Sequence, residues 1–270
     1  MAKIQSAFFD LSTLEALAGN TTAIHRLDPR IKVLTTALFV LAVVSFDKYT
    51  ISAMLPFGLF LMVIIHAAEI PAGYLGKKLL VVSPFAVMVG IFNPFLDHQP
   101  ILQLGALTIT GGWLSFGSIL LRCILTVSAV LVLIATTGFN AVCMAMVKLG
   151  MPKIFAVQLL VLYRYIFVLI DEGLSMHRAR AQRSFRRQPM GMRTFAHLVG
   201  QLLLRTLDRA ERIHLAMLCR GFDGTIRIRQ VLSITTGDLL ALAGCATLFF
   251  IMRYYALPEL LGRFITGLSS

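Results

Sequence analysis

The 270-residue sequence has little charge and, in particular, few acidic residues. Charged residues make up 14% of the chain, against about 25% in soluble globular domains, and only 13 residues are Asp or Glu. Hydrophobic residues make up 57%, and the mean hydropathy is +0.81. This balance excludes an ordinary soluble domain. It predicts an integral membrane protein whose first partner is the lipid bilayer.

The sequence also lacks the short motifs that mark several enzyme classes. It contains no P-loop, no His-Glu-x-x-His motif and no paired His or Cys spacing typical of a metal site, so we expect no catalytic residue, no cofactor and no metal site. The four cysteines form no Cys-x-x-Cys pair and are interpreted as small packing residues. No basic segment followed by an apolar run opens the chain, so we expect the first membrane helix to act as the targeting signal.

Five apolar runs reach or approach the length of a membrane-spanning helix, about 20 residues. We expect spans at 31–46, 49–70, 79–96, 113–139 and 231–257. The first is short and requires a tilted helix, and Pro56 is expected to bend the second. Residues 97–113 are expected to form an external turn or short hairpin. The predicted fold class is all-α: a polytopic membrane protein of about five transmembrane helices plus long cytoplasmic helices.

Positive charge is concentrated in one part of the chain. Between Lys148 and Arg229 lie 15 of the 25 Lys and Arg residues and five acidic residues, so this segment carries +10 of the net charge of +12. Positive residues favour the cytoplasmic side of a membrane, so we expect the N-terminus and residues 140–230 in the cytoplasm and the C-terminus outside. The expected organisation is residues 1–139 with four membrane helices, 140–230 as a cytoplasmic region, and 231–270 with the last membrane helix.

Most of residues 140–230 are predicted to be helical. Residues 140–152 predict a short amphipathic helix closed by Gly150, and residues 153–185 predict a long helix that is apolar through Ile170 and basic after it. A second long helix is expected from about residue 192 to residue 220, where Gly221 stops it. On its polar face Asp208 and Arg212 are spaced as an i, i+4 pair, and Arg205, Arg209 and Arg212 are interpreted as a solvated surface. No nucleic-acid partner is expected, because the arginines are not accompanied by an aromatic stacking surface.

Arg183 and Arg220 stand apart from the other arginines because each lies at the end of a predicted long helix, flanked by small residues. Such an arginine can cap the last carbonyl groups of its own helix. It can also extend into a groove of a partner and form a bidentate pair with a carboxylate. Two such sites at the ends of consecutive helices favour docking. Arg122, inside the fourth predicted span, has two open interpretations: a functional intramembrane charge, or a side chain that snorkels to the membrane surface.

Four features resemble the transmembrane T component of energy-coupling factor transporters, in its CbiQ-like cobalt and nickel branch. They are the segment HRLDPRIK before the first span, the segment YRYIFVLIDEGLSMHRARAQRSF, the segment RTLDRAERIHLAMLCRGFDG, and the order of these three within the chain. Family members carry two short Xaa-Arg-Xaa motifs, often Ala-Arg-Gly, at the ends of cytoplasmic coupling helices. The resemblance places them at Gln182-Arg183-Ser184 and Cys219-Arg220-Gly221, with Arg180 as the centre of a rival position for the first motif.

The resemblance implies a non-catalytic scaffold in the bacterial inner membrane. Its implied partners are two cytoplasmic ATP-binding-cassette ATPase subunits (CbiO-like) and a separate substrate-binding membrane subunit (CbiM-like), with room for a small accessory membrane subunit (CbiN-like). The implied function is to couple ATP hydrolysis to the uptake of cobalt ions, which the substrate-binding partner would handle. The alternative is a permease subunit of another ABC importer, for nickel or a vitamin, that contacts its substrate directly.

Overall fold

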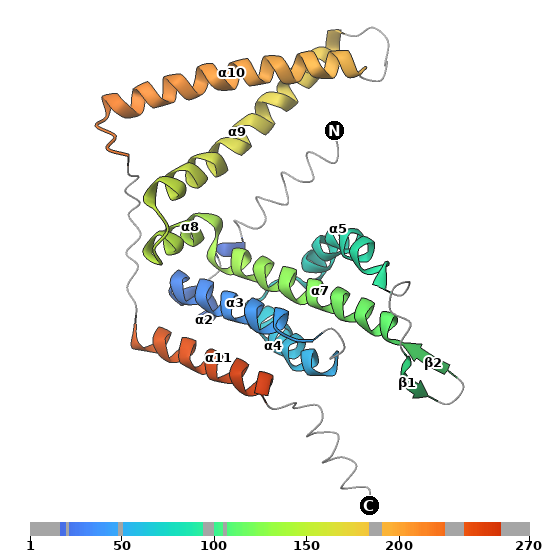
Figure 1. Ribbon diagram of the computed structural model, residues 1–270. Coiled ribbons are helices and arrows are strands. Elements are labelled where there is room, and N and C mark those ends of the chain that lie inside the picture. The colour runs from blue at the N-terminus through green and yellow to red at the C-terminus, as the bar shows by residue number, and fades with distance from the viewer. Residues whose placement is uncertain are drawn as a thin grey trace, which may run out of the picture. The chain divides into compact units, whose positions relative to one another are not determined.

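A computed structural model describes most of the chain, and helices dominate it (Figure 1). The described residues are 17–19, 22–47, 51–93, 100–104, 107–183, 191–224 and 235–254. They fall into two compact units: a membrane unit, with the described residues between 17 and 142 and from 235 to 254, and an arm unit, with the described residues between 143 and 224. The predicted all-α fold class is confirmed, with one small β-hairpin added.

The helices of the membrane unit follow the predicted order of the apolar runs. They are α2 (Ala23–Arg26), α3 (Pro29–Val44), the 3-10 helix η1 (Ser52–Met54), α4 (Leu55–Ala67), α5 (Ala72–Gly90), α7 (Gly111–Thr137) and α11 (Thr236–Tyr254). The start of α3 is encoded locally, because Asp28 is the N-cap and accepts a hydrogen bond from the Arg30 amide at 2.8 Å, while Pro29 occupies the first turn.

Two of the five predicted spans are shorter than the membrane thickness. Helix α3 has 16 residues and α4 has 13, so they extend about 24 Å and 20 Å respectively. The prediction that Pro56 bends the second span is wrong, because this proline lies in the first turn of α4. A backbone N–H in the first turn has no acceptor within the helix, so proline, which has no N–H, costs no helical hydrogen bond there. Within the described part of the chain, four helices are long and apolar enough to cross a membrane: α5, α7, α11 and the arm-unit helix α9 (Lys153–Arg183).

Helix α5 begins seven residues before the predicted third span, so Lys77 and Lys78 lie inside it rather than at its boundary. Long lysine side chains can run along a helix and reach polar surroundings, so two of them do not end it. Proline does not break this span as the sequence suggested, because α5 runs without interruption from Ala72 to Gly90 with Pro84 inside it. The hairpin prediction is confirmed. Strand β1 (Pro100–Leu104) pairs antiparallel with β2 (Leu107–Thr110) immediately before α7.

Helix α7 is the central helix of the membrane unit and contacts α3, α4 and α5. Much of its buried face consists of small residues, which let neighbouring backbones approach closely. They are Gly111, Gly112, Ser115, Ser118, Ser128, Ala129 and Ala135. The closest approach to α5 is at Gly90, where an added Cβ would lie 2.7 Å from the Phe116 ring. Only glycine therefore fits at this position without a shift of Phe116.

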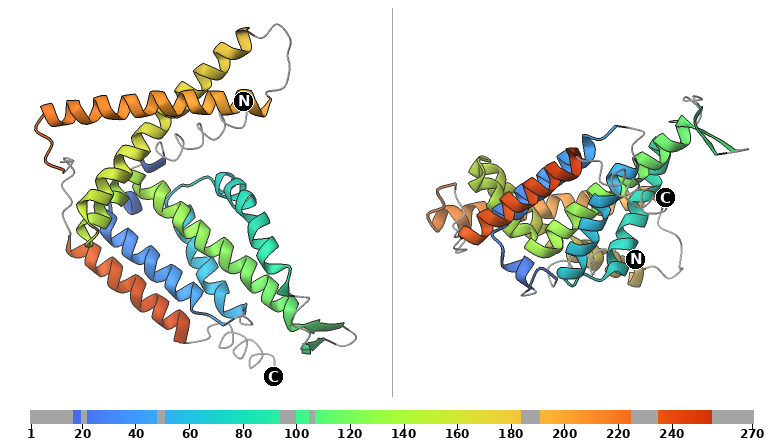
Figure 2. Two further views of the ribbon diagram at one scale, coloured as in Figure 1. Left: turned by 45° about the horizontal axis from the view of Figure 1, so that its top comes forward. Right: turned by 90° about the horizontal axis from the view of Figure 1, so that it is seen from below.

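Phenylalanine rings from three helices form the middle of the core. Phe39 of α3 contacts Phe57 and Phe60 of α4 and Phe249 of α11, with ring centroids 5.6–6.0 Å apart. Phe39, Phe57 and Phe249 are almost fully buried. Aromatic pairs in such edge-on and offset arrangements add to the stabilisation that burial gives. Figure 2 shows α11, α3 and α7 side by side, in agreement with these contacts.

Two arginines hold the C-terminal end of α3. Arg122 of α7 donates to the carbonyl of Phe46 at 2.9 Å, and Arg253 of α11 donates to the carbonyl of Ser45 at 2.8 Å. The Arg253 guanidinium also lies over the Phe46 ring, 4.4 Å from its centroid. Arg122 therefore supplies donors to carbonyl groups just beyond a helix end, where no further helical turn provides them, and its two open interpretations stay predictions.

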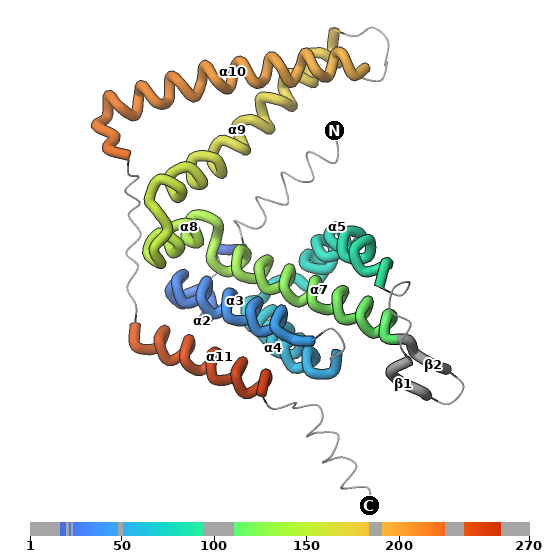
Figure 3. The backbone as a smooth tube through the Cα atoms, viewed as in Figure 1, coloured from blue at the N-terminus to red at the C-terminus, as the bar shows by residue number. Residues whose placement is uncertain are grey.

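The arm unit contains two long helices, α9 and α10 (Met192–Cys219). They follow α8 (Phe139–Lys148), the predicted short amphipathic helix. Gly150 has φ +111 and closes α8 as expected. The tube drawing shows α9 and α10 as two rods that cross, with their C-terminal ends pointing away from each other (Figure 3).

Candidate functional site

Arg220 lies at a sharply defined helix end. The amide of Phe222 donates to the Met217 carbonyl at 3.0 Å, and the amide of Gly221 donates to the Leu218 carbonyl at 2.9 Å. These two bonds are the Schellman arrangement, and Gly221 has the left-handed φ of +75 that it requires. Arg220 is the C-cap residue, and its side chain is exposed. The prediction that Gly221 stops this helix is confirmed.

Arg183 lies at the other predicted docking position, the last residue of α9. Its side chain and that of Gln182 are exposed, as is that of Cys219 beside Arg220, whereas Arg180 is half-buried. Ser184, the third residue of the first predicted motif, lies outside the described residues. The two arginines therefore share a setting: each is an exposed cation at the C-terminal end of a long helix.

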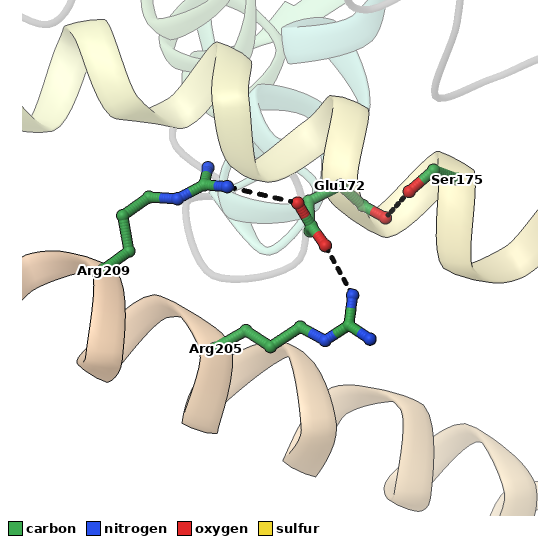
Figure 4. A network of polar contacts seen from close by, with 4 residues as sticks. All are labelled: Glu172, Ser175, Arg205 and Arg209. Carbon is green, nitrogen blue, oxygen red and sulfur yellow. Dashed lines mark hydrogen bonds and ion pairs between the residues drawn. The ribbon is translucent and has the colours of Figure 1, made fainter.

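Glu172 joins the two long helices (Figure 4). Its Oε1 accepts a hydrogen bond from Arg205 Nη1 at 2.7 Å, and its Oε2 accepts one from Arg209 Nη2 at 3.3 Å. Both arginines pair with a carboxylate of the neighbouring helix, a contact that their interpretation as a solvated surface did not include, although Arg205 remains exposed. Glu172 was not among the residues predicted to be functional. The available signal was an acidic pair, Asp171 and Glu172, directly after the apolar part of α9.

A groove of about 510 Å³ separates α9 and α10 beside this ion-pair cluster. Its lining is almost wholly apolar, with His177 as the exception. Gly173, next to Glu172, faces Leu202 of α10, and an added Cβ there would lie 3.8 Å from the Leu202 side chain. No residue of α10, which the structure describes throughout, is buried. The contact between these helices is therefore open rather than tightly packed.

A second polar cluster lies inside the membrane unit and joins α2, α3, α7 and α11. Asp28, Lys32 and Asp238 are buried, with exposed fractions of 5%, 7% and 8%. The Lys32 ammonium donates to the carbonyl of Thr136, at the end of α7, at 2.9 Å and to the carbonyl of His25, in α2, at 3.1 Å. It thereby acts as a cap for carbonyl groups at two helix ends.

The Asp238 carboxylate belongs to the same cluster and accepts hydrogen bonds from backbone amides at the starts of two helices, α3 and α11. Its Oδ2 accepts from the amide of Thr235, which precedes α11, at 3.0 Å, and its Oδ1 accepts from the amide of Asp28 at 3.4 Å. The first contact is half of a capping box. The sequence Thr-Thr-Gly-Asp at 235–238 has the spacing of this motif, so the contact could have been predicted from it. The second joins residues 210 positions apart.

His25 borders the cluster in α2. Its Nδ1 lies 2.6 Å from Thr22 Oγ1, and its Nε2 is buried. Burial, and then the nearby Lys32 ammonium, lower the pKa of His25 below its ordinary value of 6.5. The neutral imidazole is therefore favoured in the folded protein. Within the described part of the chain, no three His, Cys, Asp or Glu side chains come together as a set of metal ligands.

Comparisons with known proteins agree on one kind of protein. The CbiQ family model, described as a cobalt transport protein, matches residues 20–231. The energy-coupling factor transporter transmembrane protein EcfT of Bacillus subtilis is 27% identical over 86% of this chain and 95% of its own length. An uncharacterized protein of Methanocaldococcus jannaschii is 27% identical over 76% of this chain and 73% of its own. A putative fused cobalt transport protein CbiMQ of Methanocorpusculum labreanum is 28% identical over 45% of this chain and 20% of its own.

Proposed function

Because this chain belongs to the CbiQ family of cobalt transport proteins, we propose that it is the transmembrane scaffold (T) subunit of an energy-coupling factor importer. The chain is a multi-pass membrane component of a transporter. In the proposed assembly it joins two cytoplasmic ATPase subunits to a separate membrane subunit that binds cobalt ions. The related EcfT and CbiMQ proteins support this assignment through their names.

The observation that carries the proposal is the matching position of Arg183 and Arg220. Each is exposed at the C-terminal end of a long helix of the arm unit. At the end of α10 the Met217 and Leu218 carbonyls already accept from backbone amides, so the Arg220 guanidinium is not needed to cap these two groups. An exposed guanidinium at such a place is suited to a bidentate pair with a carboxylate of another protein. Arg183 is preferred to Arg180 as the first docking residue because Arg180 is half-buried.

The proposed mechanism uses the stiffness of helices. ATP-driven closure of the ATPase pair would move the two grooves that hold Arg183 and Arg220. Each long helix is internally hydrogen-bonded and moves as a unit, so the motion would pass along α9 and α10 towards the membrane. The proposed orientation, with the N-terminus and residues 140–230 in the cytoplasm and the C-terminus outside, is supported by the +10 charge between Lys148 and Arg229.

The test compares wild type with Arg183→Ala, Arg220→Ala and the double variant, each co-expressed with the ATPase and cobalt-binding subunits. Arg212→Ala is the matched control, because Arg212 is an exposed arginine in the same unit but not at a helix end. We expect the double variant to lose co-purifying ATPase, or to retain it and hydrolyse ATP without importing ⁵⁷Co²⁺, while Arg212→Ala behaves as wild type. Full assembly and full uptake in the double variant would refute the proposed docking role.

The same uptake measurement separates this function from that of a permease that contacts its substrate directly. We expect ⁵⁷Co²⁺ uptake to disappear when the cobalt-binding subunit is omitted from the expression. Uptake by this chain and the ATPases alone would instead favour the permease.

A further inference from the structure

We propose that Glu172 is a positioning residue that fixes how α9 and α10 cross, and that it thereby sets the separation of the two helix-end arginines. The proposal rests on the proposed coupling role of Arg183 and Arg220. Glu172 lies at the crossing itself, on the last part of α9 before its basic end, and faces Arg205 and Arg209 of α10 (Figure 4).

The geometry of the ion pairs restrains α10 along its axis. One oxygen of the carboxylate pairs with Arg205 at 2.7 Å and the other with Arg209 at 3.3 Å. The two arginines are four residues apart, about one helical turn. A single carboxylate that holds both arginines therefore resists sliding of α10 in either direction, because movement lengthens one of the two contacts. The Glu172 side chain is 23% exposed, so it is partly shielded from water.

Apolar packing at the crossing gives little competing restraint. The groove of about 510 Å³ between the helices leaves their side chains only loosely interlocked. The close contact beside Glu172 involves a glycine, Gly173, and even there an added methyl group would meet Leu202 only at ordinary contact distance. Interlocking side chains are what usually select a crossing angle between helices. With few of them here, the directional contacts of Glu172 decide the angle.

The ion-pair cluster lies at the same distance along the chain from each helix-end arginine, so it can act as a pivot between two arms of equal length. Glu172 precedes Arg183 by 11 residues, and Arg209 precedes Arg220 by 11 residues. Each arm is therefore about 16 Å long at 1.5 Å per residue. A change of ~10° in the crossing angle therefore moves the end of one arm, with its arginine, by about 3 Å relative to the other helix. A shift of that size exceeds the tolerance of a hydrogen-bonded ion pair.

Charge balance determines which substitution disturbs the crossing most. The cluster has two guanidinium groups and one carboxylate. Glu172→Gln removes the attraction and leaves two like charges side by side. Glu172→Arg brings three guanidinium groups together and drives the helices apart. The combination Glu172→Arg with Arg209→Glu restores an opposite-charge pair across the same crossing.

The experiment measures the distance between α9 and α10 directly. Spin labels are attached to Ala179→Cys on α9 and Leu215→Cys on α10, both exposed positions beyond the crossing, in full-length chain whose four native cysteines are replaced by alanine. The chain is held in lipid nanodiscs for pulsed electron–electron double resonance. Asp171→Asn is the matched control, because Asp171 is the neighbouring carboxylate on the same helix and is exposed.

We expect one narrow distance distribution for wild type and Asp171→Asn, a broader one for Glu172→Gln, and the broadest, with a shifted mean, for Glu172→Arg. The charge-swapped variant should return towards the wild-type distribution, a recovery that general damage to the fold would not produce. An unchanged distribution in Glu172→Arg, or the same broadening in Asp171→Asn, would overturn the proposal.

A second readout separates this inference from the proposed function. In the complete transporter we expect Glu172→Arg to lower the amount of ⁵⁷Co²⁺ imported per ATP hydrolysed by about threefold, which corresponds to roughly 0.6 kcal/mol for a partly exposed ion-pair cluster. Altered distances with unaltered import per ATP would support the pivot and count against the coupling role of Arg183 and Arg220. Unaltered distances would remove the pivot and leave the coupling role standing.

Discussion

Replacement of Lys32 by methionine should destabilise the membrane unit more than any other substitution of a lysine. Methionine keeps the approximate length of the side chain and removes its charge. The carbonyl groups of Thr136 and His25 would lose a charged donor at 2.9 Å and 3.1 Å. The carboxylates of Asp28 and Asp238, which are 5% and 8% exposed, would lose the buried cation beside them.

The magnitude follows from these contacts. A hydrogen bond from a charged donor contributes about 1.5–3 kcal/mol, and removal of one partner from a buried charge cluster costs about 3–5 kcal/mol. These contributions describe the same interaction and are not added. We therefore expect a loss of about 3–5 kcal/mol, which lowers the thermal midpoint by roughly 10 °C for a chain of this size.

The assay uses one of the chain's own cysteines. Cys245, on α11 of the membrane unit, is half-buried, so a thiol-reactive fluorophore should label it when a detergent-solubilised sample unfolds on heating, in a chain whose exposed Cys219 is replaced by alanine. Lys77→Met is the matched control, because it makes the same chemical change at an exposed position of α5. Equal midpoints for Lys32→Met and Lys77→Met would show that the buried cluster contributes nothing to stability, and would refute the reasoning.

Three further predictions concern single positions. Gly90→Ala should lower the thermal midpoint through the 2.7 Å clash with Phe116, by an amount that corresponds to about 1–3 kcal/mol, and wild-type stability would contradict the close packing of α5 on α7. Gly221→Ala should cost about 1 kcal/mol at the end of α10, because φ is +75, and hydrogen exchange at the Phe222 amide should accelerate; unchanged exchange would contradict the Schellman assignment. Because the pKa of His25 is lowered on folding, the unfolded chain binds a proton that the folded chain does not, so stability should fall as pH decreases below 6.5. A His25→Gln variant should show a weaker pH dependence of the midpoint over that range, and an identical dependence would exclude His25 as its source.

The features that the sequence predicted well are those fixed by residues close together in the chain. Asp28 and Pro29 mark the start of α3, and Gly150 and Gly221 close α8 and α10, because capping and left-handed backbone conformation depend on a few neighbouring residues. Pro56 was misassigned for a related reason. A proline disrupts the interior of a helix but suits its first turn, and the apolar run around Pro56 did not show where the helix begins.

The contacts that the sequence did not predict join residues far apart in the chain. The spacing of Asp208 and Arg212 predicted an i, i+4 pair, whereas the cross-helix carboxylate at Glu172 pairs with Arg205 and Arg209. No periodicity indicates which acidic residue of one helix will face which arginine of another. The same applies to Asp28 and Asp238, 210 residues apart. The candidate docking arginines could be predicted because a helix end is a local feature, but the pivot between them could not.

The hydrogen bond between Asp28 and Asp238 has a consequence for the order in which the membrane unit can form during synthesis. Helix α3 emerges from the ribosome early, whereas α11, which supplies Asp238 and packs along α3, is made more than 200 residues later. Until then the Asp28 amide lacks this acceptor and Phe39 lacks its contact with Phe249. The packing around α3 is therefore completed only after α11 has been made, and a chain released before that point leaves the start of α3 and the ring of Phe39 without these contacts.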